Sequence, residues 1–128
     1  MGYSETVDFS NLIGVTLEVI DGAEVGSDRV TFFANDDRRW IMRHYQDCCE
    51  TVELNEIIGD VSDLIGSPIL RAEVVESGPR TDPKPDEYSE SWTWTFYKIA
   101  TIRGEVVLRW LGESNGYYSE SVDFEAIS

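Results

Sequence analysis

The feature that most constrains the fold is an internal repeat. Residues 8–14 read DFSNLIG and residues 60–66 read DVSDLIG, so both follow the pattern D-x-S-[ND]-L-I-G. Four further segments match in the same order: 17–21 with 72–76, 31–33 with 95–97, 40–44 with 106–110, and 50–54 with 120–124. Such self-similarity predicts two alike structural units, residues 8–59 and 60–128, packed as one domain over 1–128. The alternative is chance similarity among short β segments.

Each unit is expected to begin with a short helical turn and to continue as about four antiparallel strands. Ser10 and Ser62 are the expected N-caps of the turns, and Gly14 and Gly66 the expected C-caps. Alternation of polar and apolar residues predicts strands at 16–20, 29–34, 39–45, 91–97 and 105–110. Trp92, Trp94 and Phe96 share one face of the half-buried strand expected at 91–97.

Turn signals separate these strands. Residues 35–37 (NDD) and 103–104 (RG) are expected turns, and Asn115-Gly116 is the strongest short hairpin signal in the chain. Residues 77–90 hold three of the four prolines and are expected to form a mobile surface loop. The predicted fold class is mainly β with short helical turns (α+β).

The net charge of −15 narrows the choice of partners. Residues 1–59 hold 12 acids and 4 bases, and residues 60–128 hold 13 acids and 6 bases, so the charge is spread over the chain. The negative electrostatic field of such a chain opposes binding to nucleic acid and to anionic membranes, and favours binding to basic proteins or cations. A simpler explanation of the negative charge is that the acidic residues merely keep a small protein soluble. We expect no transmembrane segment, no secretory signal, and a cytoplasmic location with Cys48 and Cys49 reduced.

The segment from His44 to Glu50 carries the densest group of reactive side chains. His44 with Cys48 or Cys49 and a carboxylate suggests a metal site, but structural zinc sites use spaced cysteine pairs. A cysteine nucleophile with His44 as base is a second reading, and it needs a turn at residues 46–47 to bring the groups together. Packing explains the segment more simply, so we predict no metal, no cofactor and no catalytic residue.

Two glutamates occupy equivalent places in the repeat. Glu50 shares strand parity with Val52 and Leu54, and Glu120 with Val122 and Phe124. If those faces point inward, both carboxylates are partly buried and need partners such as Arg43 or Arg109. A structural ion pair is the favoured interpretation, and a paired functional site is the alternative.

Two stretches without Lys or Arg, residues 44–70 and 110–128, lie in equivalent parts of the two units. Side by side they would form a negative face that imitates nucleic-acid phosphates toward a basic protein, or an ordinary solvated face. The candidate binding residues are Asp47, Glu50, Glu53, Glu113, Asn115, Tyr117, Tyr118, Glu120 and Asp123.

Three segments together resemble a known family. They are residues 44–52, with the string DCCE; residues 59–69, with GD and DLIGSPI; and residues 93–120, with TWTFYK and ESNGYYSE. Over residues 10–124 the chain resembles a family of small uncharacterised proteins, a domain of unknown function found in bacteriophages, prophages and bacteria. The resemblance implies a mobile-element setting and carries no activity.

The predicted function is that of a small, non-enzymatic, phage-type accessory protein that binds a basic host protein. It could antagonise a host defence or nucleic-acid enzyme. One alternative is a pocket for a small nucleotide-like ligand, or a minor hydrolase, using Glu50, Glu120 and His44. Arginines gathered in one aromatic-lined cleft would favour that alternative. A second alternative is a structural virion or homo-oligomer component.

Overall fold

The computed structural model describes residues 4–44, 50–77, 91–114 and 122–127. Before the midpoint of the chain it forms β1 (Ser4–Thr6), the 3-10 helix η1 (Phe9–Leu12), β2 (Leu17–Asp21), β3 (Arg29–Ala34), β4 (Arg39–Arg43) and β5 (Thr51–Ile58). Then follow the 3-10 helix η2 (Val61–Leu64), β6 (Arg71–Ser77), β7 (Ser91–Thr101), β8 (Gly104–Ser114) and β9 (Asp123–Ile127). The predicted mainly-β class is confirmed. No helix in these ranges is long and apolar enough to cross a membrane.

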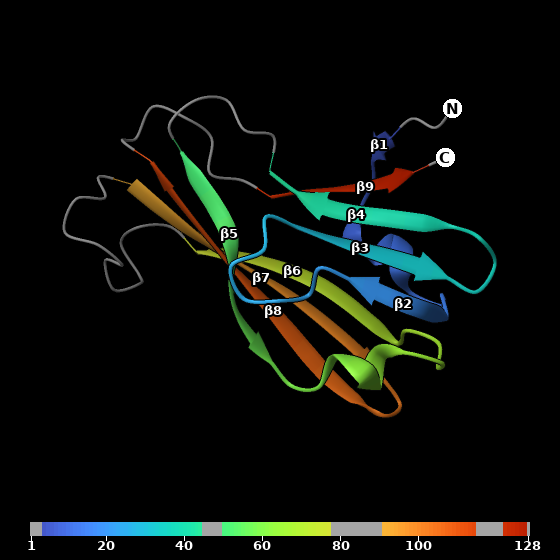
Figure 1. Cartoon of the computed structure of the whole chain (residues 1–128). Coiled ribbons are helices and arrows are strands. Elements are labelled where there is room, and N and C mark those ends of the chain that lie inside the picture. The colour runs from blue at the N-terminus through green and yellow to red at the C-terminus, as the bar shows by residue number, and fades with distance from the viewer. Residues whose placement is uncertain (1–3, 45–49, 78–90, 115–121, 128) are drawn as a thin grey trace.

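The strands form two antiparallel sheets (Figure 1). The five-stranded sheet has the order β1-β9-β4-β3-β2, and the four-stranded sheet the order β5-β8-β7-β6. Each half of the chain runs through one 3-10 helix and three consecutive antiparallel strands, and its fourth strand crosses to the other sheet. β5 pairs with β8, and β9 pairs with β4. The two halves therefore exchange their last strands, so neither half completes a sheet alone.

The two copies of the D-x-S motif form matching turns. The side chains of Asp8 and Asp60 accept hydrogen bonds from the backbone N–H of Ser10 and Ser62, both at 3.0 Å. The N-caps are thus the aspartates, and the expected serine caps are wrong by two residues. A carboxylate accepts the helix N–H groups better than a hydroxyl because it is charged.

Both motifs end on a glycine in the left-handed region, with φ +88° at Gly14 and +85° at Gly66. The C-caps themselves are Ile13 and Ile65, each one residue before the expected position. The Gly14 N–H donates to the Ile69 carbonyl at 2.7 Å, and the Gly66 N–H donates to the Leu17 carbonyl at 2.9 Å. These two bonds are equivalent in the two halves, because the donors Gly14 and Gly66 are 52 positions apart and so are the acceptors Leu17 and Ile69. That the halves arose by duplication stays a prediction.

The strand registers show which residues of β3 and β7 are equivalent in the two halves, and these differ from the predicted ones. Phe32 pairs with Trp40, and Ile99 pairs with Val106, two residues beyond each turn. Trp40 therefore matches Val106 as predicted, but Phe32 matches Ile99 rather than Phe96. The predicted alignment of these two strands is wrong by three residues, and because three is odd it matched Phe32 of the core with Phe96, which lies on the outer face.

The hydrophobic core lies between the sheets and includes Phe32, Trp40, Leu54 and Trp110. In β7 the core face carries Tyr97 and Ile99, whereas Trp94 and Phe96 lie on the opposite face with Leu111 and Arg109 of β8. The apolar alternation seen at 91–97 thus marks the outer face of the four-stranded sheet.

The hairpin expected at Asn115-Gly116 lies outside the described residues, and the described strands before and after it, β8 and β9, are not paired with each other. β8 pairs with β7 and β5, whereas β9 pairs with β4 and β1. The turn expected at residues 35–37 is confirmed, because the Ala34 N–H bonds the Arg38 carbonyl and Asp37 has φ +71°.

Candidate functional site

Four of the nine predicted binding residues lie in the described part of the chain: Glu50, Glu53, Glu113 and Asp123. The other five lie outside the described residues: Asp47, Asn115, Tyr117, Tyr118 and Glu120. Cys48, Cys49 and residues 78–90 of the expected loop also lie outside them, whereas the first residue of that loop, Ser77, ends β6.

Glu50 is buried, as its strand parity indicates, and its partner is His44. The Nε2 atom of His44 lies 2.8 Å from Oε2 of Glu50, and the side chains are 5% and 0% exposed. The sequence suggested an arginine as the partner. Arg43 instead pairs with Glu125, with Nε 3.3 Å from Oε1. Glu50 in this position cannot touch a macromolecular partner, so its role here is structural, as the hydrogen-bond partner of the buried His44 side chain.

Asp123 begins β9 and pairs in register with Arg43. Burial raises the pKa of the Asp123 carboxyl, and the nearby charge of Glu125 raises it further. His44 and Arg43 act in the opposite direction but do not cancel these effects. Asp123 therefore carries its negative charge at a cost, which a cation could lower.

Glu53 and Glu113 lie on the outer face of the four-stranded sheet. Thr51 pairs with Glu113, and Glu53 pairs with Leu111, so the two glutamates are diagonal neighbours on β5 and β8. After a bulge between Leu54 and Glu56, Glu56 joins the same face opposite Arg109. The predicted acidic face is therefore assembled in part, from Glu53, Glu56 and Glu113. Asp123 belongs to the other sheet.

Two of the clefts in the described region bear on the predicted site. One, of about 280 Å³, lies between η1, β6 and the start of β9, and its carboxylates are Asp8, Glu76 and Asp123. The other, of about 420 Å³, lies over β2, β3 and β4, with Phe33, Arg38 and Arg39 in its wall.

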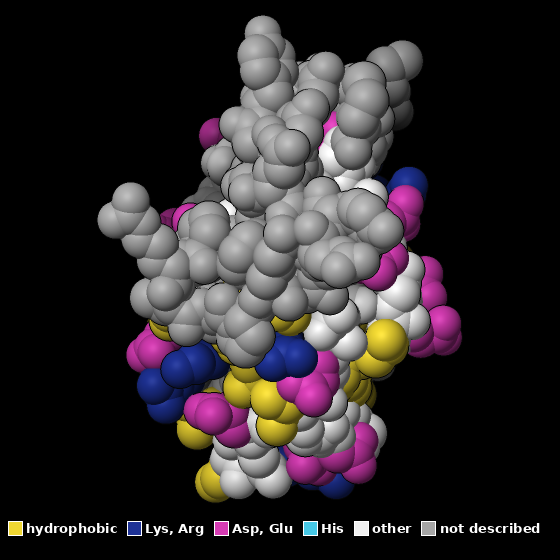
Figure 2. All heavy atoms as spheres, turned by 90° about the vertical axis from the view of Figure 1, so that its left-hand side faces the viewer, with side chains coloured by type: hydrophobic (Ala, Val, Ile, Leu, Met, Phe, Trp, Pro, Cys, Tyr) yellow, Lys and Arg dark blue, Asp and Glu magenta, His cyan; other side chains and the backbone are white. Residues whose placement is uncertain are grey.

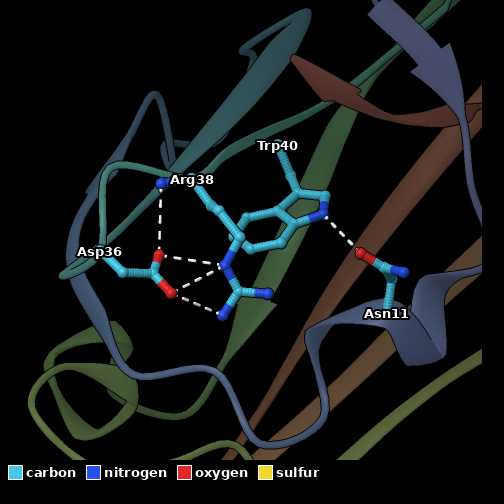
Figure 3. A network of polar contacts seen from close by, with 4 residues as sticks. All are labelled: Asn11, Asp36, Arg38 and Trp40. Atoms are coloured by element: carbon cyan, nitrogen blue, oxygen red, sulfur yellow. Dashed lines mark hydrogen bonds and ion pairs between the residues drawn. The ribbon is translucent and has the colours of Figure 1, made fainter. Parts of the chain in front are cut away.

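The larger cleft is not a basic site. Glu18 and Asp37 also line it, and Arg38 is held by Asp36 at 2.8 Å. Figure 3 shows Arg38 between Asp36 and the Trp40 ring, whose indole N–H donates to Asn11 Oδ1 at 3.0 Å. The guanidinium carbon lies 5.3 Å from the ring centroid. These contacts fix the β3–β4 turn against η1.

The other arginines lie elsewhere. Arg109 is on the outer face of the four-stranded sheet, where it stacks on Trp94 at 4.5 Å, and Arg103 is at the β7–β8 turn. In the described part of the chain, Arg38 and Arg39 line one cleft while Arg103 and Arg109 lie elsewhere, so these arginines do not converge on a single aromatic-lined cleft that would favour a nucleotide-like ligand. Among the described residues no group of three or more His, Cys, Asp or Glu side chains could hold a metal ion.

Comparison with family models gives one match, over residues 10–124. The chain belongs to the DUF7448 family, a domain of unknown function. The match covers almost the whole chain, with the second D-x-S motif in full and the first from Ser10 onward. No curated protein and no solved structure matches the chain.

Sequence reasoning missed Asp8 and Glu76 as companions of Asp123. Asp8 is part of the repeat, but no local sequence signal places it beside β9. The hydrogen bond from the Val7 N–H to the Phe124 carbonyl, at 3.0 Å, brings it there in the folded protein. Glu76 lies on the same face of β6 as Val74, two residues earlier, and both line the cleft. This two-residue spacing was visible in the sequence, but which face opens onto a cleft depends on the exchanged strand β9.

Proposed function

We propose that this protein works by binding a basic protein. The observation that carries the proposal is the position of Glu53 and Glu113 as diagonal neighbours on β5 and β8, with Glu56 on the same face. We call these three residues the β5–β8 acidic face. Carboxylates held side by side on a sheet repel each other, and a cationic partner relieves that repulsion.

The same sheet face also offers apolar contact area. Phe96 pairs with Val75, and Val107 pairs with Ile58. Val75 and Ile58 are 45% and 51% exposed. On the side shown in Figure 2, hydrophobic side chains gather in the lower part among acidic and basic ones. An apolar centre with a charged rim is the usual anatomy of a protein–protein interface.

Internal ion pairs neutralise part of the basic charge on this face. Arg71 contacts Glu73 and Glu105, at 2.9 and 3.3 Å, and Arg109 contacts Glu56 at 3.3 Å. Among the described residues this face carries three basic side chains, Arg71, Lys98 and Arg109, and more carboxylates than that, so the net charge of its described part is negative. The carboxylates are Glu53, Glu56, Glu73, Glu105 and Glu113. The negative charge favours a basic protein and disfavours nucleic acid.

The biological setting of the proposal comes from the family resemblance. In a bacteriophage or prophage, the partner would be a basic host protein in the cytoplasm, such as a defence or nucleic-acid enzyme whose phosphate-binding surface the acidic face would occupy.

The test is affinity capture from a bacterial lysate with two matched variants. Glu53→Lys/Glu113→Lys reverses two charges on the acidic face, and Glu18→Lys/Glu24→Lys reverses two exposed charges elsewhere with the same change in net charge. We expect the first variant to lose a captured basic protein that the second retains. Capture that is equal for both variants, or that depends only on net charge, would refute this surface.

A further inference from the structure

β6 is an open edge of the four-stranded sheet. It pairs with β7 on one side, and in the described part of the chain no backbone hydrogen bond satisfies its other side. Its side chains Val74 and Val75 are 47% and 45% exposed. An edge strand of this kind is a template on which an extended segment of another protein can add as a further strand.

The 280 Å³ cleft lies beside this edge. Three carboxylates line it, Asp8 from the turn before η1, Glu76 from β6 and Asp123 from β9. Phe9, Tyr97 and Val122 supply an apolar wall, and the Tyr97 hydroxyl donates to the Val122 carbonyl at 3.2 Å. Phe9 packs edge-on against Tyr97, with ring centroids 4.7 Å apart. No Lys or Arg is among the residues that line the cleft.

The electrostatics of the cleft favour a cation. Glu76 and Asp123 line the cleft together with Tyr97, and the pKa of Tyr97 is raised by burial and further by the charges of these two carboxylates. The pKa of Asp123 is raised by burial and by Glu125, so this carboxylate gains when a positive charge approaches.

The edge and the cleft are linked by strand geometry. Side chains of an added strand alternate between the two faces of the sheet, so every second one lies on the same face as Val74 and Glu76. That face opens onto the cleft, because both residues line it. A Lys or Arg at such a position can lay its methylene stem on Phe9 and Val122 and bring its charge to the carboxylates.

We propose that β6 and this cleft bind an extended segment of a partner protein, which adds as a strand and inserts a Lys or Arg side chain. The inference rests on the proposed function only in taking the partner to be basic, since it uses a different surface from the β5–β8 acidic face. A second copy of this chain is a poorer occupant, because a second β6 would bring its own Glu73 and Glu76.

Selection of binders from a random displayed peptide library tests this site. We expect the enriched peptides to carry Lys or Arg next to β-branched residues, and to shift the backbone amide NMR signals of residues 71–77 and of Asp123 in the ¹⁵N-labelled protein. Glu76→Gln should raise the Kd of these peptides about tenfold, as expected from the loss of one charge-assisted contact. Glu73→Gln is the matched control, because Glu73 lies on the same strand but on the opposite face, and it should leave the Kd within about twofold.

Several outcomes would overturn the proposal. They are enriched peptides without basic residues, signals that shift only on β5 and β8, an equal effect of the two glutamine variants, or no enrichment at all. If the β5–β8 variant loses a captured basic protein while these peptides avoid β6, the inference fails and the proposed function survives. If peptides bind β6 but no basic protein is captured, the acidic face fails and this site stands.

Discussion

The Nε2 atom of His44 and the carboxylate of Glu50 meet at 2.8 Å in the interior of the protein. His44 directly follows β4 and Glu50 directly precedes β5, so the contact spans the point where the chain passes from one sheet to the other. This crossing begins the exchange of fourth strands between the two halves. The contact between His44 and Glu50 therefore ties the end of β4 in one sheet to the start of β5 in the other.

Removing one member of this pair should destabilise the protein strongly. His44→Ala leaves a buried carboxylate without that partner, and we expect it to lower the free energy of unfolding by about 3 kcal/mol. Glu50→Gln keeps an acceptor for the imidazole and should cost less, about 1–2 kcal/mol. Urea unfolding followed by tryptophan fluorescence measures both. A loss below about 0.5 kcal/mol for His44→Ala would mean that the pair is exposed in solution.

The motif glycines should differ from Gly59 in their tolerance of a side chain. Gly14→Ala and Gly66→Ala meet no atom within 4 Å, so only the positive φ is costly, at about 1 kcal/mol each. At Gly59, with φ +102°, a new methyl group would lie 2.5 Å from the Glu105 carbonyl oxygen. Gly59→Ala should therefore cost at least about twice as much as the other two variants. Equal midpoints of urea unfolding for all three variants would contradict the backbone geometry described.

The exchange of strands predicts fragment complementation. Fragments 1–59 and 60–128 each lack the strand that completes their sheet, β9 or β5, so each alone should show no cooperative unfolding. Mixed at equal concentration, they should form a one-to-one complex with the circular dichroism spectrum of the intact chain. Size-exclusion chromatography with light scattering gives the stoichiometry. Independent folding of either fragment would contradict the exchanged topology.

Asp123 should make stability depend on pH. Its pKa is raised in the folded state, so the folded protein binds a proton that the unfolded chain releases more readily. Its charged form therefore destabilises the fold as pH rises through and above the carboxyl range. Asp123→Asn should raise the melting temperature at pH 7 and leave it nearly unchanged at pH 3, where the carboxyl is protonated in both states. An Asn variant that melts lower than the wild type at pH 7 would mean that the contacts with Arg43 and His44 dominate.

The local turns could be predicted from sequence, but the partners of the strands could not. The D-x-S motif and the glycine after it mark short helical turns because the capping carboxylate and the positive φ act within a few residues. The alternation of residues 50–54 indicates a strand, but nothing in these residues indicates that this strand, β5, pairs with β8. Strand pairing is a long-range choice, made here by the complementary inner faces of the two sheets.

In the candidate site, too, the local features could be predicted from sequence and the long-range contacts could not. Burial of Glu50 follows from its parity with Val52 and Leu54, which is a property of one strand. Its partner His44 lies across a connection, and the sequence suggested Arg43 instead because opposite charges are the simplest match. The cleft of Asp8, Glu76 and Asp123 brings together residues more than 40 positions apart, so only the folded sheets reveal it.

Salt dependence of partner binding tests the central claim most directly. The measurement is the Kd of the captured basic protein by isothermal titration calorimetry, from about 0.05 M to about 0.3 M KCl. The Debye screening length shortens markedly over this range. We predict that the Kd rises at least about tenfold over this range and that Glu53→Lys/Glu113→Lys flattens the dependence. A Kd that stays constant with salt, or a slope that the double variant leaves unchanged, would contradict the account.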